Sequence, residues 1–425
     1  MKILNEPIES FKFNDVVSFC EEGHREGIQI DYKRDYSSKG LAKHIVALSN
    51  SRGGVIIIGV EEDNKTGFPK SWDGIDADAK QIERLHQEIA NIEPYPSCTV
   101  YATDSQENKF FILVRVFAGD NTPYYVQNDS NVYVRTGNIT KSIDIASPDG
   151  LELLFGKREK AEKARNIYSL MADDTYDALV EREEEKINKK IQKQNEEKNI
   201  PMLHGNGGFI GLDDVLCKIT IQPYFPDKSI ANPKEIKDGI DDIRFKNSNV
   251  TFPQLNVTPS PKGIGYFSFS EYESVVEFQQ ILGQGLIQNR FTASRIRTDN
   301  ELRVVNMWLV AIKIFGIFQF AKRFYSKYNY QGVLVGNIHM SGLKSVPIRR
   351  IVPAGQDSWD EYGEGLLSEY NWKVKIDTNI LNNGIELKKY YIDLLREIYW
   401  DFGFEDISED TVDVFLKQSG ISFDE

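Results

Sequence analysis

Apolar positions in residues 1–148 follow the spacing of short strands and helices in alternation. In LAKHIVALSNSRGG, Leu41, Ile45 and Leu48 recur at helical spacing, and the pair Gly53–Gly54 ends the predicted helix. The run GVIIIGV that follows is short, apolar and β-branched, which predicts a buried strand. The pattern therefore predicts an α/β domain, α+β in the broader sense, at the start of the chain.

Two further apolar runs extend the predicted sheet. KFFILVRVF predicts a strong strand, and NVYVRTG alternates as a third strand would. Between the first two strands, Ala77–Ile92 predicts a surface helix that stops before Pro94 and Pro96.

The pattern changes in residues 149–200. This segment is rich in Lys and Glu, has no glycine after Gly156 and carries few apolar residues. It predicts one or two long exposed helices that connect two domains. A solvated connector is favoured over a sustained coiled coil, because the heptads do not persist.

Residues 201–425 carry a second set of elements with a core of their own. We expect strands in CKITIQPYF, GYFSFSEY, YQGVLVGNIHM and YNWKVKIDT, and helices in VVNMWLVAIKIFGIFQFAKRFYSKY and IELKKYYIDLLREIYWDFG. This pattern predicts a separate α+β domain, to which the sequence assigns no role.

Composition narrows the class of protein. The chain has 425 residues and a formal net charge of −13, which argues against nonspecific coating of DNA but not against a local basic groove. Its three cysteines are scattered, so we expect neither a disulfide framework nor a cysteine zinc site. The N-terminal residues lack a signal peptide's apolar core, and Lys313 interrupts the most apolar helical run. We therefore expect a cytoplasmic protein without membrane spans.

Candidate chemistry begins in the stretch EGIQIDYK. Strand alternation places Ile28, Ile30 and Tyr32 on one face, and Asp31 and Lys33 together on the other. Glu26 lies five residues before Asp31 and would point away from it in a regular strand. Gly27 permits a bulge or kink that would turn Glu26 back toward Asp31.

A third acid follows the next strand, where GVIIIGV runs into Glu61, Glu62 and Asp63. Acids on adjacent strands with a lysine beside them suit a hard divalent cation, Mg²⁺ or Mn²⁺, and metal-assisted phosphodiester cleavage. The other interpretation is a half-exposed edge strand with a solvated acid and a neighbouring salt bridge.

The order of four motifs resembles the Schlafen-type AlbA domain over roughly residues 10–148. The motifs are EGIQIDYK, LSNSRGGVIIIGVEED, TPYYV and NVYVRTGNIT. Family members show an acid followed by Glu-Phe-Lys, an Ala-Asn-Thr-x-Gly-Gly turn, a strand ending Ile-Gly-Val-Asp-Asp, a Pro-Tyr element and a Tyr-x-Arg-x-Gly strand. The resemblance implies a nucleic-acid-binding or nuclease domain.

The resemblance also implies roles for individual residues. Glu26 and Asp31 match the first two acids of the nuclease members, and either Glu61 or Glu62 matches the third. Lys33 matches the lysine of the motif, where it would orient water or stabilise the reacting phosphate. Here the second acid is Asp rather than Glu, which keeps the charge but shortens the reach.

Basic and aromatic residues near this site are candidates for contacts with a polyanionic strand. The combination suits unstacked single strands better than duplex readout. Ordinary surface charges are the alternative, and His44, on the helix before the glycine pair, is expected to be a packing residue. The candidate nucleic-acid contacts are Arg34, Lys43, Arg52, Tyr124 and Arg135.

The leading hypothesis is a divalent-metal-dependent nuclease that prefers RNA to DNA and acts in defence against foreign nucleic acid. The alternative is a noncatalytic nucleic-acid-binding or regulatory module whose C-terminal domain is a sensor or partner surface. Because related proteins pair two such lobes and this chain shows one, the resemblance also implies a homodimer or higher homo-oligomer, with residues 150–199 as the expected contact.

Overall fold

The computed structural model divides into two compact units, which are described separately. The first unit comprises Met1–Lys163 with Gln331–Val333, and the second comprises Ala164–Tyr330 with Leu334–Glu425. The structure describes residues 2–35, 40–63, 65–129, 131–137, 139–144, 148–198, 215–226, 229–247, 249–270, 275–296, 303–349, 351, 362–404, 408–420 and 422–423.

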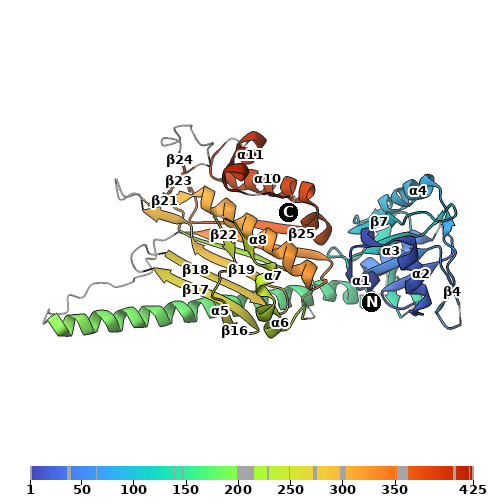
Figure 1. Ribbon diagram of the computed structural model, residues 1–425, viewed down its shortest axis with the longest axis horizontal. Coiled ribbons are helices and arrows are strands. Elements are labelled where there is room, and N and C mark those ends of the chain that lie inside the picture. Colours follow the sequence, from blue (N-terminus) through green and yellow to red (C-terminus); the bar gives the residue numbers. More distant parts are fainter. Residues whose placement is uncertain are drawn as a thin grey trace. The chain divides into compact units, whose positions relative to one another are not determined.

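The first unit is built on a four-stranded sheet with the order β1-β2-β9-β7. Its elements are coloured from blue to teal in Figure 1. Its elements are α1 (Lys2–Asn5), η1 (Ile8–Ser10), α2 (Phe13–Glu21), β1 (Ile30–Lys33), α3 (Leu41–Ser49), β2 (Gly54–Ile58), β3 (Glu61–Glu62), β4 (Pro69–Ser71), β5 (Ile75–Asp76), α4 (Ala79–Ala90), β6 (Ile92–Glu93), β7 (Cys98–Ala102), β8 (Lys109–Phe110), β9 (Ile112–Val116), β10 (Tyr125–Val126), β11 (Asn131–Thr136) and β12 (Ile139–Asp144).

Helices cover both faces of this sheet, because β2 is apolar on both sides. Val55 and Ile57 pack with α1, η1 and α2, whereas Ile56 and Ile58 pack with α3 and α4. β1 runs parallel to β2 at one edge of the sheet. The predicted α/β domain is therefore confirmed, with its helices and strands close to the predicted ranges.

The glycine pair after α3 lets β2 lie close to its neighbours. A Cβ at Gly54 would lie 2.3 Å from the carbonyl oxygen of Gln29, and a Cβ at Gly53 would lie 2.5 Å from that of Val116. Neither approach is possible for a residue with a side chain. The pair therefore sets the start of β2 against the segment that leads into β1.

The predicted connector is one helix, α5 (Pro148–Lys198). Its first turns belong to the first unit, where Leu154 packs against Val132 and Val134. The boundary between the two units falls inside α5, between Lys163 and Ala164.

The second unit is an antiparallel sheet of seven strands in the order β16-β17-β18-β19-β13-β22-β25. Its elements are β13 (Leu216–Pro223), α6 (Pro233–Asp238), α7 (Ile240–Ile243), β14 (Phe245–Lys246), β15 (Thr251–Phe252), β16 (Thr258–Ser260), β17 (Gly263–Ser270), β18 (Val275–Leu282), β19 (Ile287–Thr292), β20 (Ser294–Ile296), β21 (Arg303–Asn306), α8 (Met307–Lys327), β22 (Val333–Ser341), β23 (Pro347–Arg349), β24 (Tyr362–Glu364), β25 (Glu369–Asp377), α9 (Thr378–Asn382), α10 (Gly384–Asp401) and α11 (Glu409–Gln418).

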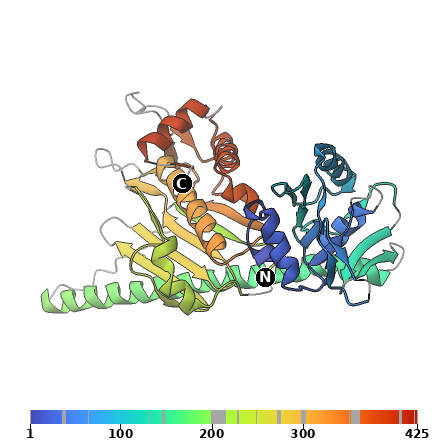
Figure 2. The same ribbon diagram turned by 45° about the vertical axis from the view of Figure 1, so that its right-hand side comes forward.

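Its two faces are covered differently. α8 and α10 lie over one face and form the main core with it, whereas α5 crosses the other face, as Figures 1 and 2 show. The predicted buried helix is confirmed as α8, and no helix that the structure describes has an apolar stretch long enough to cross a bilayer.

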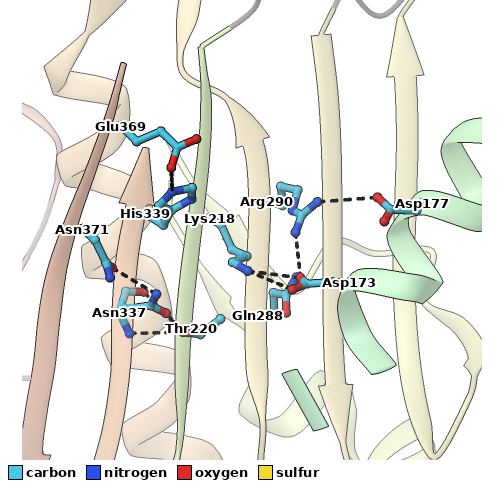
Figure 3. A network of polar contacts seen from close by, with 10 residues as sticks. All are labelled: Asp173, Asp177, Lys218, Thr220, Gln288, Arg290, Asn337, His339, Glu369 and Asn371. Atoms are coloured by element: carbon cyan, nitrogen blue, oxygen red, sulfur yellow. Dashed lines mark hydrogen bonds and ion pairs between the residues drawn. The ribbon is translucent and has the colours of Figure 1, made fainter. Parts of the chain in front are cut away.

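The helix α5 is held on the sheet by charge as well as by apolar contacts. Asp173 lies 3.0 Å from Lys218 and 2.7 Å from Arg290, whose side chains reach it from β13 and β19 (Figure 3). Tyr176 lies under the guanidinium of Arg290 and packs on Phe278. This half of the predicted connector is thus packed on the second unit and not solvated all round.

Candidate functional site

The strand β1 carries Asp31, the second candidate acid, into the interior of the first unit. Ile30 and Tyr32 pack in the cluster under α2, and Asp31 pairs with Ile56 of β2, whose side chain faces α3. Strand alternation therefore turns Asp31 toward α3, as predicted. Ile28 precedes the strand and is exposed, so the strand is shorter than expected.

A turn before β1 returns Glu26 toward the strand. The amide of Gly27 donates a hydrogen bond to the carbonyl of Ile30 at 3.1 Å. The Glu26 carboxylate then accepts a hydrogen bond from the Tyr32 amide at 3.3 Å. The predicted reversal is present, although a Cβ at Gly27 would meet nothing within 4 Å, so the turn does not require glycine.

The guanidinium of Arg135 lies between the two acids. Its Nη2 atom is 3.0 Å from Glu26 Oε1 and 3.2 Å from Asp31 Oδ1. The same side chain donates to the carbonyls of Gly27 and Ile30. Arg135 is therefore a buried cation that holds the turn, the strand and both carboxylates together.

Asp31 has two further cationic or polar neighbours. Lys33 Nζ lies 2.7 Å from Oδ1, and His44 Nδ1 lies 2.7 Å from Oδ2. Thr140 Oγ1 is within 3.2 Å of both His44 Nδ1 and Arg135 Nη1, which closes a ring of contacts around Asp31. His44 is thus part of the site, and its assignment as a packing residue needs correction.

The two acids at the end of the second strand point to different neighbours. Glu62 contacts Glu26 through a side-chain hydrogen bond. Glu61 lies 3.0 Å from Lys70 and 3.3 Å from Arg34 instead. Adjacent strand residues face opposite ways, so Glu62 joins Glu26 and Asp31 in what we call the carboxylate cluster.

Burial and mutual repulsion divide the protons of this cluster unequally. Desolvation, together with contacts to Asp31 and Glu62, raises the pKa of Glu26 to about 9. Burial alone would raise the pKa of Asp31, but the contacts with His44 and Glu26 and the charge of Lys33 lower it well below its ordinary value. At neutral pH, Glu26 therefore keeps its proton and Asp31 is ionised.

This arrangement does not fit a bound divalent cation as it stands. Arg135 lies where a cation shared by Glu26 and Asp31 would lie, and it already compensates the charge of the ionised Asp31. Across the described ranges, no three His, Cys, Asp or Glu side chains are arranged to hold a metal ion.

Asn50 connects three of the sequence motifs. Its side-chain amide donates to the carbonyls of Tyr124 and Tyr133, both at 2.9 Å, and its oxygen accepts from the Tyr124 amide at 2.8 Å. Asn50 is buried, so these bonds fix the segments around β10 and β11 against the end of α3. The motif order in the sequence thus reflects one hydrogen-bonded junction.

Two of the predicted nucleic-acid contacts lie inside the domain. Arg135 is buried among the carboxylates, and Tyr124 is buried with its hydroxyl donating to Asp120. As placed, neither can reach a phosphate or a base. Arg135 belongs to β11, whose central residues are buried on both faces, and alternation alone does not reveal this.

The other predicted contacts remain at the surface. Arg34, Lys43 and Arg52 are exposed, and Lys43 lies over the ring of Tyr133 at 5.4 Å. Tyr125, next to the buried Tyr124, is also exposed. The first unit therefore keeps separate cations and an accessible ring at its surface.

The first unit is thus a small α/β domain in which the edge strand β1 and the strand β11, which carries Arg135, enclose a network of buried carboxylates. Residues 26–144 of this unit match the model of the family described as Schlafen, AlbA_2. The resemblance predicted from the sequence is confirmed over these residues, and it suggests an interaction with nucleic acid. A comparison of the chain with curated proteins found no match.

Proposed function

We propose that the first unit binds single-stranded nucleic acid, with RNA preferred to DNA, without catalysing its cleavage. The observation that carries this proposal is the closure of the carboxylate cluster by Arg135. Glu26 and Asp31 are buried and both contact Arg135, so they do not repel a phosphate chain, while the exposed Lys43 and Arg52 remain available to bind one.

Exposed aromatic rings favour a single strand over a duplex. Tyr95 is 65% exposed and lies two residues after β6, and Tyr125 is 40% exposed and begins β10, which pairs with β6. Stacking on such rings is available to unpaired bases and is tolerant of sequence. The role of Arg135, Asp31 and Glu26 in this function is to hold the turn before β1 in place.

The experiment is a fluorescence-anisotropy titration of the full chain with single-stranded RNA, single-stranded DNA and duplex DNA, in EDTA and at several salt concentrations. We expect metal-independent binding whose logarithmic affinity falls by about 0.7 per phosphate contact per logarithmic unit of salt. K43Q and R52Q should each weaken binding to all sequences. K193Q, an exposed lysine late in α5, is the matched control. Absence of binding at low salt would refute the proposal.

A metal-dependent nuclease is the second candidate. It is favoured by the contacts that Glu26 makes with Asp31 and with Glu62, because a carboxyl group whose pKa is raised by neighbouring carboxylates would gain from an added cation. It requires Arg135 to leave the carboxylates. Cleavage of RNA that depends on Mn²⁺ or Mg²⁺ and disappears in a folded D31N variant would establish it over noncatalytic binding.

We also propose that the chain acts as a homodimer or higher homo-oligomer, with a defence role carried over from the family resemblance. The exposed Ile167 and Leu170 on α5 supply an apolar surface for a second copy. Light scattering that gives a monomer at micromolar concentration would contradict self-association.

A further inference from the structure

A polar cavity of about 340 Å³ opens in the first unit where β1, β2 and β4 end. Its lining includes Arg34 after β1, Gly59 after β2 and Ser71 at the end of β4. The start of α4 and the strands β5 and β8 complete the wall. Its volume is that of a small-ligand site.

Two glycines leave part of the wall of this cavity without side chains. The amide of Gly74 donates to the carbonyl of Gly59 at 3.1 Å, and a Cβ at Gly59 would lie 2.8 Å from the Gly74 Cα. Gly59 and Gly74 have φ angles of +106° and +72°, which side-chain-bearing residues rarely adopt. Both positions therefore require glycine, which lets the two backbone segments lie against each other at the wall of the cavity.

One group of lining residues offers hydrogen-bond acceptors. The carboxylates of Asp73 and Asp76 have no side-chain partner within the described part of the chain, whereas Asp78 caps α4 by accepting from the Lys80 amide. Gln81 donates to the carbonyl of Asp76, and its buried Oε1 accepts no hydrogen bond from the described residues.

Another group of lining residues offers positive charge. Arg84 and Lys109 line the cavity, and no described carboxylate forms an ion pair with either side chain. Arg34 lines it too and lies 3.3 Å from Glu61. A ligand that satisfies both groups must carry an anion and, elsewhere, several hydrogen-bond donors.

We infer that this cavity holds one unpaired nucleotide of the bound strand, with guanine preferred. This inference rests on the proposed function. A nucleotide carries a phosphate for Arg84 and Lys109. Among the bases, guanine alone presents two adjacent donor groups, N1–H and the 2-amino group, that match a carboxylate such as Asp76.

The position of the cavity fits a nucleic-acid strand that passes the carboxylate cluster. Lys33 contacts Asp31 of the cluster, and the next residue, Arg34, lines the cavity. Glu62 contacts Glu26, while its neighbour Glu61 lies 3.5 Å from Ser71 of the cavity lining. The short strand β3 therefore separates the two features.

The test uses the full chain and two RNA probes, an oligouridine and the same oligouridine with one central guanosine. We expect the guanosine probe to bind about tenfold more tightly, the discrimination that one bidentate base contact gives. D76N should abolish this preference and leave the affinity for oligouridine unchanged. R84Q should weaken binding of both probes.

Matched controls come from the same helix. E83Q and K80Q change exposed charges of α4 that do not line the cavity, so both should keep the guanosine preference. Circular dichroism establishes that each variant is folded.

Each other outcome has a definite meaning. Equal binding of the two probes by the wild type, or a preference that survives in D76N, would overturn the inference while nucleic-acid binding stands. Tight binding of GMP alone without discrimination between the probes would identify a free-nucleotide site and also overturn it. Failure to bind either probe would refute the proposed function itself.

Discussion

The guanidinium of Arg135 lies 3.0 Å from the carboxylate of Glu26, and both side chains are almost completely buried. Removal of one partner from a buried charge network is strongly destabilising, because the remaining polar groups lose their compensation. We expect R135Q to lower the free energy of unfolding of the first unit by about 3–5 kcal/mol. Calorimetry of the full chain should show this change as a lower temperature for the unfolding transition of the first unit.

The matched control for this variant is R52Q. Arg52 is exposed, so its loss should change the free energy of unfolding by no more than about 0.5 kcal/mol. Equal effects of R135Q and R52Q would show that the buried network does not hold β1 in place.

Stability of the first unit should depend on pH through Glu26. Its pKa is raised to about 9, so between the unfolded value near 4.5 and pH 9 the folded state holds a proton that the unfolded state releases. Glu26 therefore makes the folded state less stable as pH rises through this window. The substituted side chain of E26Q cannot ionise. The unfolding transition of its first unit should therefore rise relative to that of the wild type as the pH increases from 5 to about 9.

The opposite sign applies to Asp31. The pKa of Asp31 is lowered in the folded state, so the ionised side chain stabilises the folded state at pH values above its pKa in the unfolded chain. This stabilisation is lost as the solution becomes acidic.

A constant difference in the first-unit transition between E26Q and wild type across the whole pH range would contradict the assignment of the shared proton to Glu26.

Neighbouring glutamates should differ in their effect on this pH dependence. Glu62 contacts Glu26 and helps to raise its pKa, whereas Glu61 pairs with Lys70 and Arg34. E62Q should therefore move the pH window of Glu26 to lower pH, and E61Q should leave it in place. The same calorimetric titration, repeated on both variants, separates them, and a shift in E61Q alone would reverse the assignment.

Docking of α5 on the second unit should depend on Asp173. The half-buried Lys218 and Arg290 both contact this carboxylate. D173N should therefore lower the free energy that holds α5 on the sheet by about 1–3 kcal/mol. We expect faster hydrogen exchange in α5 around Tyr176. D174N changes the next residue, which is exposed, and should leave exchange unchanged. Protection that is unaltered in D173N would assign the docking to apolar contacts alone.

Alternation and motif order allowed much of the first unit to be predicted. Period-two spacing placed Ile30 and Tyr32 on the opposite face from Asp31, because each residue of a strand reverses the side-chain direction. The pairing of Glu26 with Asp31 followed from the same alternation once the chain was allowed to turn at Gly27.

Features that depend on packing between elements could not be predicted in this way. His44 reaches Asp31 only because α3 lies over β1 at a particular rotation. The choice between Glu61 and Glu62 depends on a register shift between β3 and β4. Arg135 lies in a strand buried on both faces, so neither face is marked as solvent-facing by its residues.

The position of Leu154 has a practical meaning for dissecting the chain. A fragment truncated at residue 148 would remove the α5 turn that packs on Val132 and Val134, and with it the carbonyl that accepts from Thr122. Such a fragment would expose apolar surface and aggregate, whereas a fragment extended through Lys163 keeps the turn of α5 that covers this surface. Expression trials of a fragment that ends at the motif boundary would therefore mistake a missing helical turn for an inability to fold.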